Sequence, residues 1–200
     1  MKKISALILI IMILIPGCNS QKDLNYFSKI NTSFFFSQTI SSVSFNSIFY
    51  TDDGIIKQKA NVNIIKIKDI NNGVLYLLKL DKVSDVKEEF LNLGYFYVQK
   101  DNIFQLDSTQ ADLLLSKKNI PKDARIVCQD NELPDSLGQN EIGVHQYIMV
   151  DKDLRKYHYY NNSVESGFYE NITWEKNKGI VKFESGYGAQ RDGIELSIMR

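Results

Sequence analysis

The sequence has few of the residues from which metal and redox sites are commonly built. It contains two cysteines and two histidines in 200 residues, and the cysteines lie far apart. This content fits neither a disulfide-rich scaffold nor a cysteine-based zinc site, and two histidines are too few for a histidine-rich metal cage. We therefore expect neither a bound metal ion nor a cofactor.

The sequence also lacks an excess of charge of either sign. Basic and acidic residues number 24 each, so the formal charge is zero. A nucleic-acid-binding protein needs a basic face to displace counterions from phosphates, so we expect no nucleic-acid partner. Hydrophobic residues make up 44% of the chain, which is ordinary for a protein that folds around a core.

The first 17 residues have the three parts of an export signal. Two lysines precede an apolar run over residues 4–15, and Pro16 and Gly17 break the helix just before Cys18. The run is well short of the roughly 20 apolar residues that a permanent membrane-spanning helix needs. We predict that residues 1–17 are a signal peptide.

The end of this segment, Ile15-Pro16-Gly17-Cys18, resembles the lipobox of bacterial lipoproteins. An aliphatic residue stands three places before the cysteine and a small residue directly before it, although Pro16 is less usual in its place. The resemblance implies a diacylglycerol on the Cys18 thiol, palmitate among the acyl chains, and cleavage that makes Cys18 the first mature residue. It further implies a protein held on the extracytoplasmic side of the cell membrane. The alternative is a signal peptide that carries no lipid.

We divide the mature chain into two parts. Residues 18–42 are predicted to be the lipidated N-terminus and a tether, and residues 43–200 a single antiparallel-sheet domain. Extended, alternating segments in this domain are joined by short turns such as Asp52-Asp53-Gly54 and Asn71-Asn72-Gly73. Parallel strands would need long crossover connections, which are absent from this pattern.

Two short helices interrupt the strands. Ser84 is a candidate N-cap for one that ends near Gly94, and Ser108 or Thr109 is a candidate N-cap for one that runs through Lys117. The fold class predicted is therefore α+β and mainly antiparallel: a curved sheet or half-barrel of hairpins with one or two short helices.

The two histidines lie on the two arms of one predicted hairpin. With a two-residue turn at residues 152–153, His145 faces Tyr160 and both histidines share one face of the sheet. With a three-residue turn they point to opposite faces. We keep His145 and His158 as candidate ligand-binding residues, beside the alternative that they pack among the aromatic residues of this hairpin.

The most glycine-rich segment is Gly186-Tyr-Gly-Ala-Gln-Arg-Asp-Gly193. It is not a dinucleotide-binding fingerprint, because its third glycine comes two places late and only seven residues follow it. One interpretation is a simple connection between the last two strands. The other is a loop that displays Arg191 and Asp192 as a ligand-binding point, in which Arg191 grips a carboxylate or a phosphate.

No recognised catalytic motif is present in the sequence. Cys128 stands among apolar neighbours and is expected to be a buried core residue. Many acid pairs are available, but nothing singles out two of the glutamates Glu165, Glu170, Glu175, Glu184 and Glu195. We expect a protein that is not an enzyme.

Two segments of the mature chain resemble those of other lipoproteins. Trp174-Glu-Lys-Asn-Lys-Gly-Ile-Val-Lys-Phe183 resembles the late hairpin of the LolA/LppX-type carriers, which implies a curved half-barrel. The segment SGYGAQRDGIEL, over residues 185–196, resembles the tail of uncharacterised lipoproteins from low-GC bacteria. Neither resemblance carries a functional residue to this chain.

Three hypotheses of function follow. The first is a lipid-anchored extracytoplasmic protein that acts as a non-catalytic binding or interaction module, with an unknown protein or a small apolar ligand as partner. The second is a half-barrel carrier of a lipid or other apolar ligand, with a deep cavity lined by Phe45, Ile65, Leu77 and Ile172. The third is a cell-envelope hydrolase that uses carboxylates or the two histidines.

Overall fold

The computed structural model describes residues 33–84, 86–100, 102–138, 140–165, 167–188 and 192–199. The predicted signal peptide, the lipidation site Cys18 and the candidate residue Arg191 lie outside the described residues. Within the described ranges, no helix has both the length and the apolar character that crossing a membrane requires.

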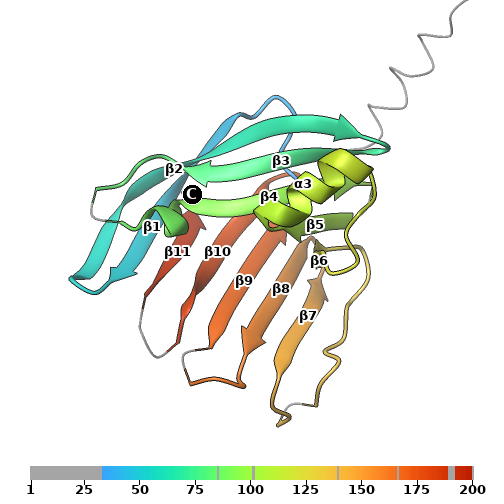
Figure 1. Cartoon of the computed structure of the whole chain (residues 1–200). Coiled ribbons are helices and arrows are strands. Elements are labelled where there is room, and N and C mark those ends of the chain that lie inside the picture. The colour runs from blue at the N-terminus through green and yellow to red at the C-terminus, as the bar shows by residue number, and fades with distance from the viewer. Residues whose placement is uncertain are drawn as a thin grey trace, which may run out of the picture.

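The described residues form one antiparallel sheet of eleven strands and two short helices (Figure 1). The strand order is β6-β5-β4-β3-β2-β1-β11-β10-β9-β8-β7, and the predicted fold class is confirmed. In chain order the elements are β1 (Ser42–Thr51), β2 (Gly54–Ile70), β3 (Gly73–Leu80), α2 (Glu88–Leu91), β4 (Asn92–Gln99), β5 (Asn102–Leu106), α3 (Ser108–Lys117), β6 (Arg125–Cys128), β7 (Val144–Asp151), β8 (Leu154–Asn161), β9 (Phe168–Glu175), β10 (Gly179–Tyr187) and β11 (Gly193–Ile198).

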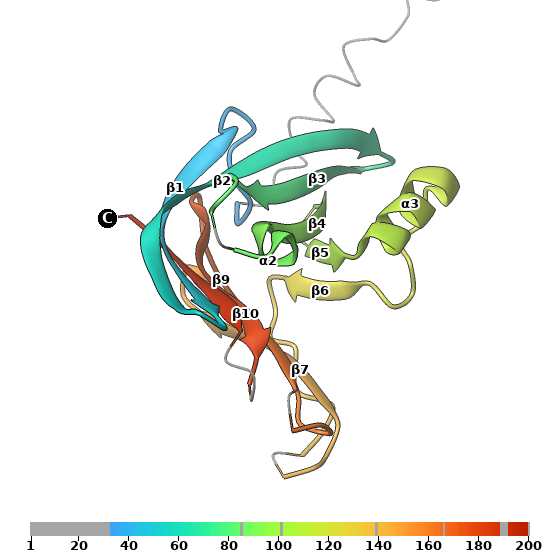
Figure 2. The ribbon, with the colours of Figure 1, turned by 60° about the vertical axis from the view of Figure 1, so that its left-hand side comes forward.

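The sheet curves until its two edge strands approach each other (Figure 2). The long strand β2 makes this possible, because its first half pairs with β1 and its second half with β3. At the far side, the segment after β6 reaches β7, where Leu133 and Ile148 form an isolated antiparallel bridge. Arg155 on β8 also donates from Nε to the carbonyl oxygen of Gln129, at 2.9 Å. The result is a nearly closed, barrel-like sheet.

Side chains fill the interior between the two halves of this sheet. Trp174 is fully buried, with its ring centroid 5.8 Å from that of Phe96 and 6.1 Å from that of Phe35. Its Nε1 donates a hydrogen bond of 2.9 Å to the carbonyl oxygen of Val127. This bond ties β9 to β6 across the core, so the indole holds the two halves together by both packing and hydrogen bonding.

Two sequence predictions about apolar residues are wrong. The predicted tether over residues 18–42 extends too far, because Phe34, Phe35 and Phe36 are buried in the main core. The cavity of the carrier hypothesis is also not lined as predicted. Phe45 and Ile172 lie in the filled core, whereas the side chains of Ile65 and Leu77 pair on the opposite face of the sheet, and Ile65 is 43% exposed.

The two helices differ from their predicted bounds for local reasons. The first is only the four-residue α2, whose N-cap position is Lys87 and not the predicted Ser84. The backbone of Lys87 is not helical, and its side chain makes no capping hydrogen bond. The second, α3, has the predicted length, but its N-cap is Asp107, which forms a capping box with Gln110. The helix α3 covers a small second core on the outer face of the sheet, formed by Ile70, Leu75, Tyr97, Leu106, Ala111 and Leu114.

Candidate functional site

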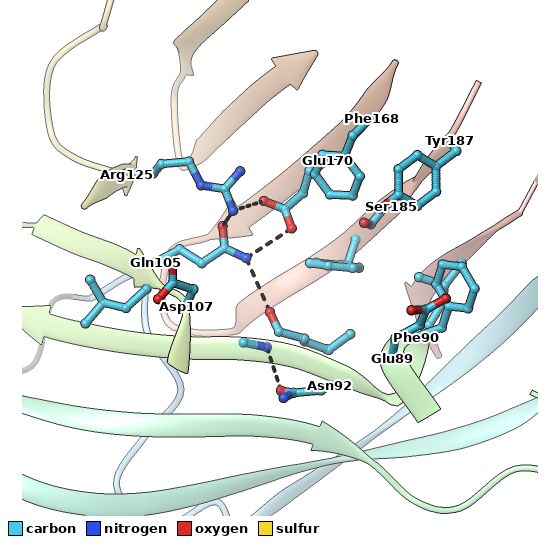
Figure 3. Close-up of a pocket in the computed structure, with 15 residues that line it drawn as sticks. Glu89, Phe90, Asn92, Gln105, Asp107, Arg125, Phe168, Glu170, Ser185 and Tyr187 are labelled. Carbon is cyan, nitrogen blue, oxygen red and sulfur yellow. Dashed lines mark hydrogen bonds and ion pairs between the residues drawn. The ribbon is translucent and has the colours of Figure 1, made fainter. Parts of the chain in front are cut away.

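A cavity of about 260 Å³ opens between the two halves of the sheet, and we call it the mouth pocket (Figure 3). It lies at one end of the strands, because its lining comes from the starts of β4, β6, β9 and β11 and from the ends of β5 and β10, together with α2. Its lining residues are Glu89, Phe90, Asn92, Leu93, Gly94, Gln105, Leu106, Asp107, Arg125, Phe168, Glu170, Phe183, Ser185, Tyr187 and Ile194.

Three polar side chains from three strands meet in one wall of the mouth pocket. Arg125 Nη2 lies 3.1 Å from Glu170 Oε1 in an ion pair, and it also donates to Gln105 Oε1 at 2.7 Å. Gln105 Nε2 in turn donates to Glu170 Oε2 at 3.0 Å. The three groups form a closed triangle in which β5, β6 and β9 each supply one corner.

Glu170 carries a carboxyl group in a setting that disfavours its charge. The residue is 4% exposed. Burial raises the pKa of Glu170, and the Arg125 guanidinium and the Gln105 amide act against that rise. Oε1 is buried and has no hydrogen bond of good geometry. The ion pair with Arg125 therefore offsets only part of the cost of burying this oxygen.

In the rest of the mouth pocket, most of the buried lining residues are apolar, and most of the exposed ones at its rim are polar. Phe183 and Ile194 are buried at its base, and Phe168 and Phe90 are half-buried higher up. The ring of Tyr187 is 40% exposed and meets that of Phe168 edge to face at 5.5 Å between centroids. Glu89, Asn92 and Asp107 form the exposed rim.

This lining suits a small molecule with an apolar part and at least one polar group. Such a mixture of aromatic walls and a few placed polar groups is typical of ligand pockets. Within the described part of the chain, no three histidine, cysteine, aspartate or glutamate side chains are grouped so as to hold a metal ion.

Sequence reasoning did not single out this pocket, although one signal was present. Along β9, alternation places Phe168, Ile172 and Trp174 on the inner face, and Glu170 falls between them on the same face. Gln105 is likewise a polar residue on the inner face of β5. A polar residue at an inward position is the pattern that marks this site.

The sheet separates Glu170 from two of the other candidate glutamates, Glu184 and Glu195. Glu170 faces the interior and lines the mouth pocket. Glu184 and Glu195 stand opposite each other on neighbouring strands, on the outer face. Cys128 is buried as predicted, and burial raises the pKa of its thiol, which makes it a poor nucleophile.

The two histidines lie together on the outer face of β7 and β8, in the register of a two-residue turn. His145 pairs with Tyr160 and Tyr147 with His158 across the strands. The rings stack in these same pairs, at 4.4 Å and 4.7 Å between centroids. His158 Nδ1 also lies 2.9 Å from Asn171 Oδ1. Neither histidine lines the mouth pocket.

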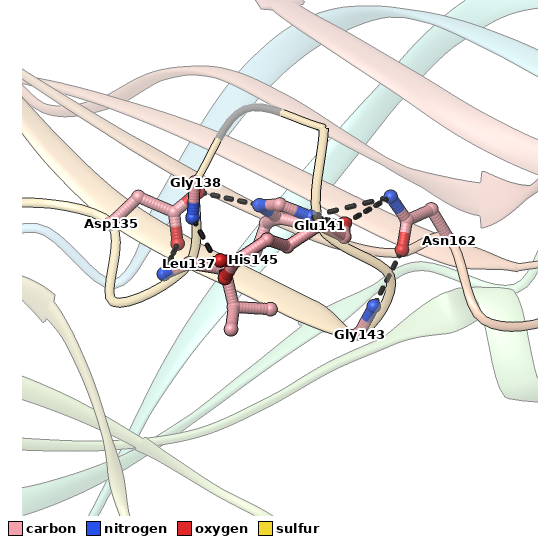
Figure 4. A network of polar contacts seen from close by, with 7 residues as sticks. All are labelled: Asp135, Leu137, Gly138, Glu141, Gly143, His145 and Asn162. Atoms are coloured by element: carbon pink, nitrogen blue, oxygen red, sulfur yellow. Dashed lines mark hydrogen bonds and ion pairs between the residues drawn. The ribbon is translucent and has the colours of Figure 1, made fainter.

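His145 fastens the loop between β6 and β7 onto the sheet (Figure 4). Its ring is fully buried, with Nδ1 2.6 Å from Asp135 Oδ2 and Nε2 3.0 Å from the carbonyl oxygen of Glu141. The hydrogen bond to Asp135 raises the pKa of His145 above its ordinary value, against the opposing effect of burial. Asp135 Oδ2 and the Glu141 carbonyl oxygen are acceptors, and the imidazolium, which has two N–H donors, satisfies both. Asn162 Nδ2 also lies 3.3 Å from Nε2.

Asp192 is a buried residue and not a displayed one. It is 7% exposed, and its Oδ2 accepts a hydrogen bond of 2.9 Å from Lys87 Nζ. Gly186 and Gly193 pair where β10 leads to β11, so this segment does connect the last two strands. A side chain on Gly186 would place its Cβ 2.4 Å from the backbone oxygen of Asp192, which explains the glycine.

No protein-family model matches the sequence, and no curated protein matches it significantly. Among solved structures, the chain is similar to a candidate lipoprotein from Parabacteroides distasonis, with 11% identity and a TM-score of 0.34. It is also similar to a candidate exported protein with a YmcC-like fold from Bacteroides fragilis, with 11% identity and a TM-score of 0.33. Each match covers 84% of this chain and 98% of the other, and at these TM-scores the likeness carries no argument about function.

Proposed function

We propose that this chain is a lipid-anchored, extracytoplasmic binding protein that holds a small organic ligand in the mouth pocket. The observation that carries the binding role is the triangle of Arg125 with the buried Gln105 and Glu170 in the wall of an open cavity. Burying charged groups is costly, and a site that presents them to a cavity is a common place for ligand recognition.

The anchoring role rests on the N-terminal sequence. A short apolar run, a helix break and Cys18 follow one another in the order that lipid attachment needs. Two or more acyl chains on one cysteine would hold the chain at the membrane far more firmly than a single chain. The polar segment after Cys18 would then place the folded part outside the membrane on the extracytoplasmic side.

The anchor is tested by metabolic labelling of cells with palmitate. The wild-type chain should take up the label and partition into the detergent phase, and Cys18→Ala should do neither. Ser20→Ala is a matched control two residues away and should behave as the wild type does. An unlabelled wild-type chain, or a Cys18→Ala variant that still partitions into detergent, would rule out the lipid.

The ligand-binding role is tested by native mass spectrometry of the chain released from membranes. We expect a bound small molecule on the wild type. Asn92→Trp places a large ring at the exposed rim of the mouth pocket and should remove that mass. Asn46→Trp puts the same ring on the exposed outer face of β1 and should leave it in place. A bare wild-type chain, or a ligand kept by Asn92→Trp, would contradict this role.

A cell-envelope hydrolase is the second candidate, and one observation favours it. A buried carboxyl group whose pKa is raised is a property of general acids, and Glu170 has it. Binding is better supported, because both Glu170 oxygens face Arg125 or Gln105. Release of p-nitrophenol from p-nitrophenyl glycosides by the wild type, but not by Glu170→Gln, would reverse this order.

A further inference from the structure

The mouth pocket has an uneven distribution of charge. Its lining includes three carboxyl side chains, Glu89, Asp107 and Glu170, but one cationic side chain, Arg125. Asp107 already accepts the backbone N–H of Gln110 as the N-cap of α3, yet a capping carboxylate keeps its negative charge. The pocket thus presents an excess of negative charge to whatever enters it.

When it is ionised, Glu170 adds to this field from a buried position. Its charge lies behind a wall of low polarity, where solvent screens it less than it screens a surface carboxylate. Arg125 compensates this charge from one side only, because its Nη2 is shared between Glu170 Oε1 and Gln105 Oε1. A clefted site lined by one sign of charge attracts ligands of the opposite sign.

The aromatic walls favour the same kind of ligand. Phe90, Phe168 and Tyr187 line the upper part of the cavity. The faces of aromatic rings attract cations as well as apolar groups. The same part of the molecule already shows such a contact, because the guanidinium carbon of Arg125 lies 4.8 Å from the centroid of the Tyr159 ring, which in turn packs 6.0 Å from Phe168.

We propose that the mouth pocket selects small organic cations, in which a protonated amine or a guanidinium is joined to an apolar group. The positive group lies in the field of Glu170, Glu89 and Asp107, and the apolar group lies against the three aromatic rings. This inference rests on the proposed binding function and names its ligand class. The opposite possibility, an anion drawn by Arg125, is an outcome of the test.

The test uses three probes that share a benzyl group and differ in charge: phenethylammonium, 2-phenylethanol and phenylacetate. The protein is residues 18–200 with Cys18→Ser, which retains every described residue and takes no lipid. In calorimetric titrations at about pH 7, we expect phenethylammonium to bind at least about fivefold more tightly than 2-phenylethanol, and phenylacetate to bind most weakly. Raising NaCl from about 0.05 M to about 0.5 M should weaken binding of the cation.

Two neighbouring glutamates provide a matched pair of variants. Glu89 lines the mouth pocket, whereas Glu88 precedes it on the same helix and pairs with Lys79 outside the pocket. Glu89→Gln should weaken phenethylammonium binding about two- to fivefold, as expected for one exposed charge. Glu88→Gln removes the same charge from the chain and should change the affinity by less than about 1.5-fold, because it does not face the cavity.

The outcomes separate this inference from the proposed function. Equal or tighter binding of phenylacetate, abolished by Asn92→Trp, overturns the cation preference but leaves a ligand-binding pocket in place. Equal effects of Glu89→Gln and Glu88→Gln also overturn it, because the attraction would then be that of the whole chain. If none of the probes binds, the cation preference is wrong, and native mass spectrometry of the wild type decides independently whether the pocket binds a ligand.

Discussion

Arg125 and Glu170 form an ion pair across the seam between the two halves of the sheet, with Nη2 3.1 Å from Oε1. Arg125 lies at the start of β6 and Glu170 near the start of β9. The pair therefore joins strands that are not neighbours in the sheet, and it does so at the wall of the mouth pocket. Under the proposed function, this one contact contributes both to stability and to the binding site.

Arg125→Met should destabilise the fold, because it leaves the Glu170 carboxylate buried without its cation. Loss of one partner of a fully buried pair costs roughly 3–5 kcal/mol, and about 2 kcal/mol is expected here because the Arg125 side chain is 28% exposed. Urea unfolding measures this loss. Adding Glu170→Gln to this variant should recover part of the stability. An Arg125→Met variant as stable as the wild type would contradict the role of the pair.

The cost of Arg125→Met should depend on pH in a defined direction. Burial raises the pKa of Glu170 above its ordinary value of 4.5, so the folded chain holds this proton to a higher pH than the unfolded chain does. Stability from this group is thus fully present below the unfolded pKa and is lost as the pH rises through the folded pKa. The loss caused by Arg125→Met should shrink as the pH is lowered from 7 towards 4.5, and a loss that grows would refute this assignment.

Asp135→Asn should loosen the loop that His145 holds, and most strongly at mildly acidic pH. The pKa of His145 is raised above 6.5, so its contribution is present below that value and is lost as the pH rises through the folded pKa. Burial would raise the pKa of Asp135, but hydrogen bonds from His145 and from the Leu137 N–H outweigh it and lower that pKa below 3.8. The contribution of Asp135 is present above 3.8 and is lost as the pH falls through its folded pKa.

The contact between His145 and Asp135 is tested by the thermal midpoint of unfolding. The fall caused by Asp135→Asn should be largest between pH 3.8 and pH 6.5 and smaller above the raised pKa of His145. Asp153→Asn, in the exposed turn at the other end of the same hairpin, is the control and should cause a small shift at every pH. A loss of stability for Asp135→Asn that increases steadily with pH would be inconsistent with the imidazolium.

Asp107→Ala should lower the free energy of unfolding by about 1 kcal/mol, because it removes the N-cap of α3. The Asp107 carboxylate accepts the backbone N–H of Gln110 at 2.8 Å, and the Gln110 side chain accepts that of Asp107 at 3.0 Å. Asp112→Ala removes an exposed acid from the middle of the same helix and should cost much less. Equal losses for the two variants in chemical denaturation would argue against the cap.

Trp174→Phe should destabilise the core by about 3 kcal/mol. The variant opens a void beside Phe35 and Phe96 and leaves the Val127 carbonyl oxygen buried without its donor. Phe49→Leu, at another fully buried position, makes a smaller void and breaks no hydrogen bond of this kind, so it should cost less. A smaller loss for Trp174→Phe than for Phe49→Leu would contradict the role of the indole hydrogen bond.

Local features of the fold could be predicted from the sequence because their causes are local. The turns after Thr51 and Ile70 follow from Asp-Asp-Gly and Asn-Asn-Gly, and the strands on either side have the alternation expected of them. The register of the hairpin that carries the two histidines follows from a two-residue turn, which was one of two open possibilities. The inward orientation of the Trp174 side chain follows from the alternation of buried and half-buried residues along β9.

The site could not be predicted, because it depends on contacts between distant parts of the chain. Gln105 and Glu170 are 65 residues apart, and Tyr50 and Glu195, which join the first and last strands, are 145 apart. Turn chemistry and alternation determine neither pairing. The same reason explains why the predicted tether was too long. Phe34 is buried only because distant parts of the chain form the core around it.

The most direct test of the mouth pocket as the binding site is chemical-shift mapping by NMR. Phenethylammonium is titrated into ¹⁵N-labelled residues 18–200 carrying Cys18→Ser, and the amide shifts are followed residue by residue. The predicted result is a cluster of shifted amides around Glu89, Gln105, Glu170 and Tyr187, with little change on the outer face around His145. Shifts centred on the outer face of β7 and β8, with the mouth pocket unaffected, would contradict it.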